Sequence, residues 1–144
     1  LERALALGAD HVVNAREAVA AGETVAERVK ALTGGRGADV VFELVGTAET
    51  IPQAMGMLAR RGKLVFVGYS FDTFETHPIG LVIGEVSVMG SVGNTLDELR
   101  EAVRLIGEGK VRTLVDRELP LADFAAGLDA VRKGEVVGRV VLRP

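Results

Sequence analysis

Two short stretches of this 144-residue chain are apolar nearly throughout, and both end on Val-Gly. The first runs from Gly37 to Gly46 (GADVVFELVG) and the second from Gly62 to Gly68 (GKLVFVG). Neither alternates between apolar and polar residues, as a strand with one solvated face does. Continuous apolar runs of this length are typical of parallel strands that are covered by helices on both faces. These runs therefore predict two strands of a parallel sheet.

Amphipathic helices with clear start signals surround these strands. Thr24 and Glu27 have the spacing of a capping box, and so do Thr95 and Glu98. The first box predicts a helix that ends at Gly34-Gly35, and the second begins the clearest helix, NTLDELREAVRLIGEG. We also expect a partial helix at the first residues, a strand at 11–14, a helix at 50–62 that stops at Gly62, a loop at 69–84, a strand at 85–93, a helix carrying Phe124, Leu128 and Val131, and a closing strand at 138–142. This alternation predicts an α/β fold with right-handed crossovers.

Composition narrows the class of protein. The chain is 48% hydrophobic and 26% charged, with a net charge of −3, which is ordinary for a globular domain and unlike a disordered segment. The mild negative charge argues against nucleic acid binding, which needs a basic face. The sequence has no Cys, so disulfides and thiolate metal sites are excluded, which fits a reducing cytoplasm. No apolar stretch is long enough to span a bilayer.

Three glycines follow strands at the edge of the sheet where ligands bind. Ligands of open α/β sheets lie beyond the carboxyl ends of the strands, where Gly46, Gly68 and Gly90 are expected. A glycine lets a ligand approach the backbone closely. Each glycine alone is more simply explained as the opening of a turn, but three in successive strands favour a shared ligand surface. The glycine-rich run at 34–37 falls at the opposite edge and is interpreted as a turn.

Other motifs do not support chemistry within this chain. The run GEGK at 107–110 resembles half of a phosphate-binding loop, but Val111 stands where Ser or Thr is required. His11 and His77 have no partners at metal-ligand spacing. Glu43 has no second carboxylate at a useful spacing, so we interpret it as a strand-end residue rather than a catalyst. We predict no catalytic residue and no metal ligand in the chain.

Several segments together resemble the coenzyme-binding domain of the medium-chain dehydrogenases/reductases, the zinc alcohol dehydrogenase-like superfamily. These segments are LGADHVVN, GADVVFELVG, GKLVFVG, SVGNTLDELREAV and PLADFAAGLDAVRKGEVVGRVVL, of which the last is the most specific. The likeness covers essentially the whole of 1–144. It implies a Rossmann-type doubly wound parallel sheet that binds NAD or NADP.

The resemblance also implies which residues meet the cofactor. They are Val45 and Gly46 on the adenosine side, Val67, Gly68 and Tyr69 near the nicotinamide, Gly90, Ser91 and Val92 at its carboxamide, and Arg139 for the pyrophosphate.

The sequence departs from the family pattern at its start. It has no G-x-G-x-x-G fingerprint, and its first helix begins without a capping residue. We therefore expect 1–144 to be a partial Rossmann domain from a longer protein, lacking the first βαβ unit and the catalytic domain, so that zinc could be held only in the absent domain. In the strand order 3-2-1-4-5-6, the segment 11–14 would lose its neighbour and DVVFELV would become an exposed edge. We expect no stable monomer from these residues alone.

The leading functional hypothesis is the cofactor-binding portion of an NAD(P)-dependent oxidoreductase that acts on an alcohol, carbonyl or enone, inactive by itself. An alternative is a non-catalytic assembly module, because the resemblance implies homo-oligomers that pair the strand around 81–90. A third possibility is another Rossmann-like enzyme, such as a methyltransferase. The substrate and the choice between NAD and NADP stay open.

Overall fold

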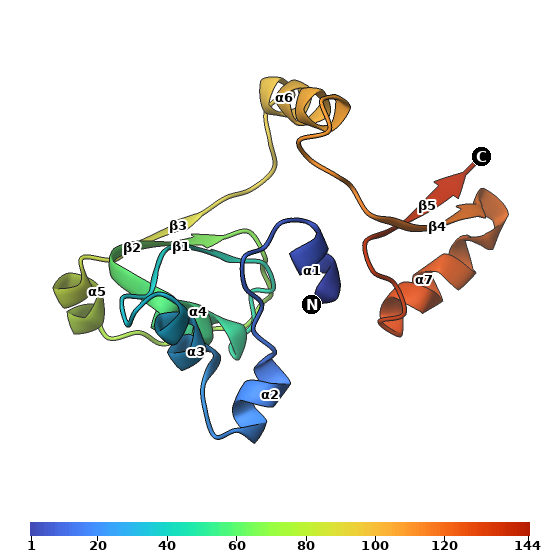
Figure 1. Cartoon of the computed structure of the whole chain (residues 1–144). Helices are drawn as coiled ribbons and strands as arrows, with labels where there is room; N and C mark the ends of the chain where they lie inside the picture. Colours follow the sequence, from blue (N-terminus) through green and yellow to red (C-terminus); the bar gives the residue numbers. More distant parts are fainter. The chain divides into compact units, whose positions relative to one another are not determined.

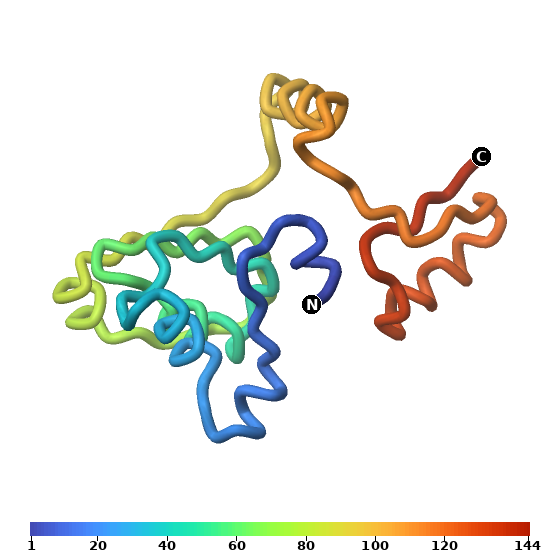
Figure 2. The backbone as a smooth tube through the Cα atoms, viewed as in Figure 1, coloured from blue at the N-terminus to red at the C-terminus, as the bar shows by residue number.

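The computed structural model describes all residues of the chain and divides into two compact units (Figure 1). The first unit spans Leu1–Gly93 and the second Asn94–Pro144. Figure 2 traces the backbone of the first unit from blue to yellow and that of the second from yellow to red. No helix in the structure has the length and apolar character needed to cross a membrane.

The first unit is built on three parallel strands. They are β1 (Ala38–Glu43), β2 (Leu58–Phe66) and β3 (Ser87–Gly90), in the spatial order β1-β2-β3. The register places Val41 opposite Leu64 and Leu64 opposite Val88. The structure therefore confirms the α/β class, the parallel sheet and the edge position predicted for the first apolar run.

The helices of the first unit are α1 (Glu2–Ala6), α2 (Ala15–Ala20), α3 (Val25–Leu32), α4 (Thr50–Met57) and α5 (Pro78–Gly84). The capping box of α3 is formed: the Thr24 amide donates to Glu27 Oε2 at 2.7 Å, and the Glu27 amide donates to Thr24 Oγ1 at 3.1 Å. Gly34 and Gly35 follow this helix with φ angles of 64° and 84°, which a glycine adopts without strain. Local signals thus place α3 correctly.

The core of the first unit lies between α4 and the sheet. Leu64 is fully buried and packs with Ala54 and Leu58, while α4 contacts β1 and β2 and α3 contacts α4. The other face of β1 is open, because Phe42 is 63% exposed. The expectation that the first apolar run is covered on both faces is therefore wrong for this unit, since helices cover only the side of Val41.

Three element boundaries differ from the sequence predictions. Residues 11–14 form no strand, because no neighbouring strand offers hydrogen bonds, and Asn14 instead caps α2 by accepting from the Arg16 amide at 3.1 Å. The helix expected to reach Gly62 ends at Met57, and β2 begins at Leu58. The expected loop at 69–84 contains α5, which has Pro78 in its first turn. The strand expected at 85–93 spans only Ser87–Gly90, so the pairing region expected around 81–90 is helical in its first part.

The second unit contains α6 (Leu96–Gly107), β4 (Val115–Pro120), a short 3-10 helix (Leu121–Asp123), α7 (Phe124–Arg132) and β5 (Arg139–Arg143). β4 and β5 pair in parallel, and α7 contacts β4. The helices and β5 were expected, whereas β4 was not. Its sequence, VDRELP, is half charged and lacks the apolar pattern of a buried strand.

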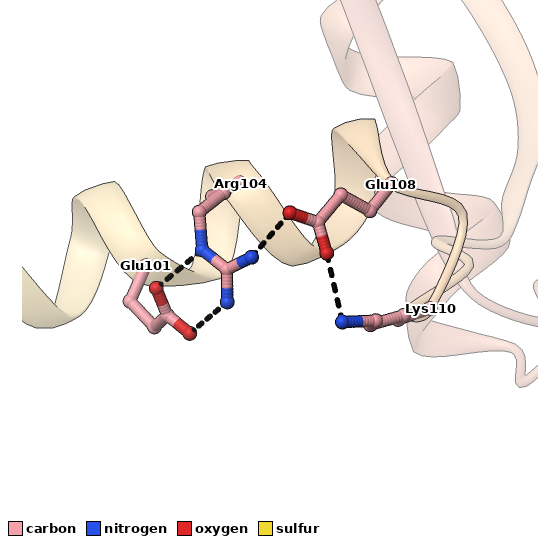
Figure 3. Close-up of polar contacts among 4 residues, drawn as sticks. All are labelled: Glu101, Arg104, Glu108 and Lys110. Carbon is pink, nitrogen blue, oxygen red and sulfur yellow. Dashed lines mark hydrogen bonds and ion pairs between the residues drawn. The ribbon is translucent and has the colours of Figure 1, made fainter.

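Helix α6 has a capping box and several ion pairs between its own side chains. Thr95 and Glu98 form the predicted capping box, with the Thr95 amide 2.7 Å from Glu98 Oε2. Figure 3 shows Arg104 bridging Glu101 and Glu108, with Lys110 beside Glu108 at 2.9 Å. These exposed ion pairs add little stability individually, but their i,i+3 and i,i+4 spacing favours the helix.

Candidate functional site

The carboxyl ends of the three parallel strands of the first unit lie level with one another. The register aligns Glu43 of β1 with Phe66 of β2, and Phe66 with Gly90 of β3. The chain leaves these strands in the first loop (residues 44–49), the second loop (residues 67–72) and the segment from Ser91. Every predicted cofactor residue except Arg139 therefore lies at one edge of this sheet.

Glu43 ends β1 with a side chain that is only 4% exposed. Its Oε1 accepts from the Val45 amide at 3.2 Å and from the Thr50 hydroxyl at 2.7 Å, and its Oε2 accepts from the Gly46 amide at 2.6 Å. The carboxylate thus faces the first loop and the start of α4. Its role in the structure is to fold this loop.

The glycines of the two loops are explained by contact between the loops. Gly46 has a φ of 78°, and a Cβ added to it would lie 2.5 Å from the Tyr69 Cα. A Cβ on Gly68 would lie 2.1 Å from the Leu44 carbonyl carbon. No side chain fits at either position, so backbone meets backbone here. Gly90 differs, because a Cβ there would enter open space.

Two polar residues that the sequence analysis overlooked fasten the second loop to the first. Ser70 Oγ donates to the Gly46 carbonyl at 2.6 Å and accepts from the Asp72 amide at 3.0 Å. Asp72 Oδ2 accepts from the Ala48 amide at 3.0 Å. A Ser and an Asp just after a strand end are typical of side chains that bond to nearby backbone, which was the available signal.

Apolar side chains of the predicted site point to solvent. Tyr69 is 88% exposed and Val92 is 93% exposed, and Val45 and Val67 are also exposed. An apolar surface beside bare backbone suits the rings of a nucleotide. The two loops contain no Lys or Arg, so they fit the apolar parts of a dinucleotide better than its phosphates.

Arg139, the residue predicted for the pyrophosphate, belongs to the second unit. It begins β5, where its amide donates to the Leu114 carbonyl at 2.9 Å and its guanidinium donates to the Gly138 carbonyl at 3.2 Å. Its side chain is exposed and carries a fixed positive charge, which suits an anion. No three His, Asp or Glu side chains gather in a way that could hold a metal ion.

Comparison with known proteins shows one consistent family. A family model described as zinc-binding dehydrogenase matches residues 1–108. An NAD-dependent alcohol dehydrogenase of Sulfurisphaera tokodaii is 34% identical over 145 residues, and a D-arabinose 1-dehydrogenase (NADP(+)) of Saccharolobus solfataricus is 30% identical over 141 residues. These alignments cover 100% and 98% of this chain and 40% and 38% of the two relatives.

A solved structure shows the same fold. The crystal structure of the alcohol dehydrogenase from Aeropyrum pernix aligns with a TM-score of 0.88 and 39% sequence identity, covering 100% of this chain and 40% of that protein. The chain thus spans about two fifths of the length of the proteins it matches.

Proposed function

Because this chain belongs to the zinc-binding dehydrogenase family, within the medium-chain dehydrogenase/reductase superfamily, we propose that it is the cofactor-binding part of an NAD(P)-dependent oxidoreductase. The observation that carries the proposal is the edge where β1, β2 and β3 end in register. There, two loops packed backbone to backbone expose apolar side chains at the place where α/β sheets bind ligands. Relatives named as NAD- and NADP-dependent dehydrogenases support the choice of ligand.

In the proposed arrangement, the residues of this chain bind and orient the dinucleotide. Val45 and Gly46 flank the adenosine, Val67 to Tyr69 lie near the nicotinamide, and Gly90 to Val92 meet its carboxamide. The cofactor, when bound, supplies hydride transfer to or from an alcohol, carbonyl or enone substrate. Arg139, in the second unit, stays a prediction for the pyrophosphate, and we expect no proton-transfer group from this chain.

Two properties are proposed to depend on residues outside 1–144. The ribose-binding acid that separates NAD from NADP follows the glycine fingerprint, which this sequence does not contain. The thiolate ligands that zinc favours are also missing, because the chain has no Cys. We therefore expect cofactor choice and any use of zinc to be decided elsewhere in the protein.

The proposal is tested by titrating the intact protein with NADH and with NADPH. We expect one of them to bind in the micromolar range or tighter, whereas residues 1–144 alone should be inactive and bind neither in that range. Failure of the intact protein to bind either cofactor would overturn the proposal. Micromolar binding by 1–144 alone would contradict the expectation that the glycine fingerprint, which this sequence does not contain, is needed to bind the phosphates.

A second candidate function, a non-catalytic assembly module, is favoured by one observation. β3 is an edge strand of the sheet, and all of its residues are exposed. An unpaired edge of this kind can add a strand from a second copy. In this case the protein would form oligomers through β3 without needing a cofactor.

A further inference from the structure

The carboxylate of Glu43 is the buried charged group of this chain that the proposed function does not use. It is nearly inaccessible, and the groups that bond to its side chain are uncharged. Its partners are the amides of Val45 and Gly46 and the Thr50 hydroxyl, all in or just after the first loop. A buried carboxylate without a cation must be compensated by hydrogen bonds, and here the first loop and the first residue of α4 provide them.

The backbone of the same residue also holds the second loop. The Glu43 carbonyl accepts from the amides of Val67 and Gly68, each at 2.9 Å. Glu43 therefore contacts both loops, with its side chain on the first and its carbonyl on the second.

The far ends of the two loops are joined independently. Ser70 bonds to the Gly46 carbonyl, and Asp72 bonds to the Ala48 amide. Between these hydrogen bonds the two loops pack in direct contact, because any side chain at Gly46 or Gly68 would collide with the backbone of the other loop. The loops have hydrogen bonds at both ends and close packing in the middle, so neither can shift without the other.

We propose that Glu43, Ser70 and Asp72 are positioning residues that lock the first and second loops into a single rigid unit, whose exposed face is the dinucleotide surface. The ligand named here rests on the proposed function, whereas the rigid unit does not. Residues proposed for the adenosine side and residues proposed for the nicotinamide side then move together. A change in the second loop should therefore alter recognition of the adenosine half.

Glu43→Gln is the sharpest variant, because it preserves the shape of the side chain. The glutamine side chain has one acceptor oxygen and one NH2 group. The backbone amide of Val45 or of Gly46, which now donates to a carboxylate oxygen of Glu43, must then face the NH2 group, which is also a donor. Ser70→Ala is a milder variant that removes the second loop's bond to Gly46. The matched control is Glu75→Gln, which changes an exposed Glu outside both loops that has no hydrogen-bond or ion-pair partner.

The first readout needs no cofactor. In the intact protein, amide hydrogen exchange at Gly46 and Ala48 should be about tenfold faster in Glu43→Gln and several-fold faster in Ser70→Ala, because a hydrogen bond to a charged group is worth more than a neutral one. Glu75→Gln should leave exchange at these amides unchanged. Unchanged exchange in both loop variants would overturn the rigid unit.

The second readout uses the dissociation constants of ADP-ribose and NADH (or NADPH, if that is the cofactor bound). If the loops act as one, Ser70→Ala should weaken ADP-ribose and the dinucleotide by a similar factor of about three to ten, with the substrate KM unchanged at saturating cofactor. If Ser70→Ala weakens only the dinucleotide, the coupling between the loops is refuted. If Glu43→Gln does not fold, the Ser70→Ala variant alone still tests whether the two loops are coupled.

The two proposals fail in different ways. A wild-type protein that binds neither cofactor refutes the proposed function, while hydrogen exchange still tests the rigid unit. A wild-type protein that binds cofactor normally, with loop variants identical to it in exchange and affinity, refutes the rigid unit and leaves the proposed function standing.

Discussion

Gly68 lies directly against the backbone of Leu44, so close that a Cβ on Gly68 would come within 2.1 Å of the Leu44 carbonyl carbon. The glycine that ends each of the two apolar runs is thus required by packing between neighbouring loops. The fold itself imposes this requirement, whether or not a ligand binds. It also explains why a glycine follows each of these two strands within three residues.

The first prediction follows from this contact. Gly68→Ala should destabilise the protein by about 1–3 kcal/mol or more, because the new methyl group forces backbone away from backbone. Gly90→Ala is the control at the end of the neighbouring strand, where a Cβ has open space, and should change stability by less than about 1 kcal/mol. Urea unfolding of the intact protein measures both, and equal effects would contradict the packing explanation.

The same pair of variants separates packing from cofactor contact. If Gly90 meets the nicotinamide carboxamide, Gly90→Ala should weaken cofactor binding while leaving stability nearly unchanged. A Gly90→Ala protein with wild-type affinity would remove Gly90 from the proposed site.

The second prediction concerns acid stability. Hydrogen bonds from Arg61 and then from Arg60 lower the pKa of Glu85, at distances of 2.7 Å and 2.6 Å. A carboxyl group with a lowered folded-state pKa stabilises the fold above its unfolded pKa of about 4.3 and loses that contribution as the pH falls through the folded value. Glu85→Gln should therefore reduce the loss of stability between neutral and acidic pH.

Melting temperatures of wild type and Glu85→Gln, measured from pH 7 down to pH 3, test the predicted direction of this change in stability with pH. The two proteins should differ most at pH 7 and converge at the acid end. A difference that grows as the pH falls would contradict the assignment of the ion pair to the folded state.

Local sequence signals predicted much of the first unit and part of the second. The capping boxes at Thr24 and Thr95 depend on neighbours three residues away, and the apolar runs of β1 and β2 need no partner to be recognised. These signals depend on short-range chemistry, and the structure confirms the elements that they predicted.

The features that were predicted wrongly or missed depend on residues far away in the sequence. The segment at 11–14 is apolar enough for a strand, but no strand lies beside it to complete the ladder. β4 has charged residues and is held by pairing with β5 across the intervening α7. A local pattern indicates that Ser70 and Asp72 bond to nearby backbone, but their partners in the first loop lie 24 residues away, and that pattern does not identify them.

The third prediction tests the proposed pairing of β3. Val88→Asp places a charge in the middle of this exposed edge and should lower the mass of any oligomer, because like charges would face each other across the interface. Val19→Asp, at an exposed position on α2, is the control. Sedimentation velocity measures the masses, and an unchanged mass for Val88→Asp would count against an interface through β3.

The fourth prediction concerns the exposed side of β1. Val40 and Phe42 leave an apolar face beside an unpaired edge, which is a template for association. Residues 1–144 produced alone should therefore associate or unfold rather than form a stable monomer. A monodisperse monomer with a cooperative melting transition in solution would show this expectation to be wrong.

The central claim is that a nicotinamide dinucleotide lies across the carboxyl ends of β1, β2 and β3. Its most direct test is a crystal structure of the intact protein with NADH or NADPH bound. The account predicts contacts from the first loop at Val45 and Gly46, from the second loop at Val67 to Tyr69, and from the end of β3 at Gly90 to Val92. A dinucleotide bound elsewhere, with these residues free of it, would contradict the account.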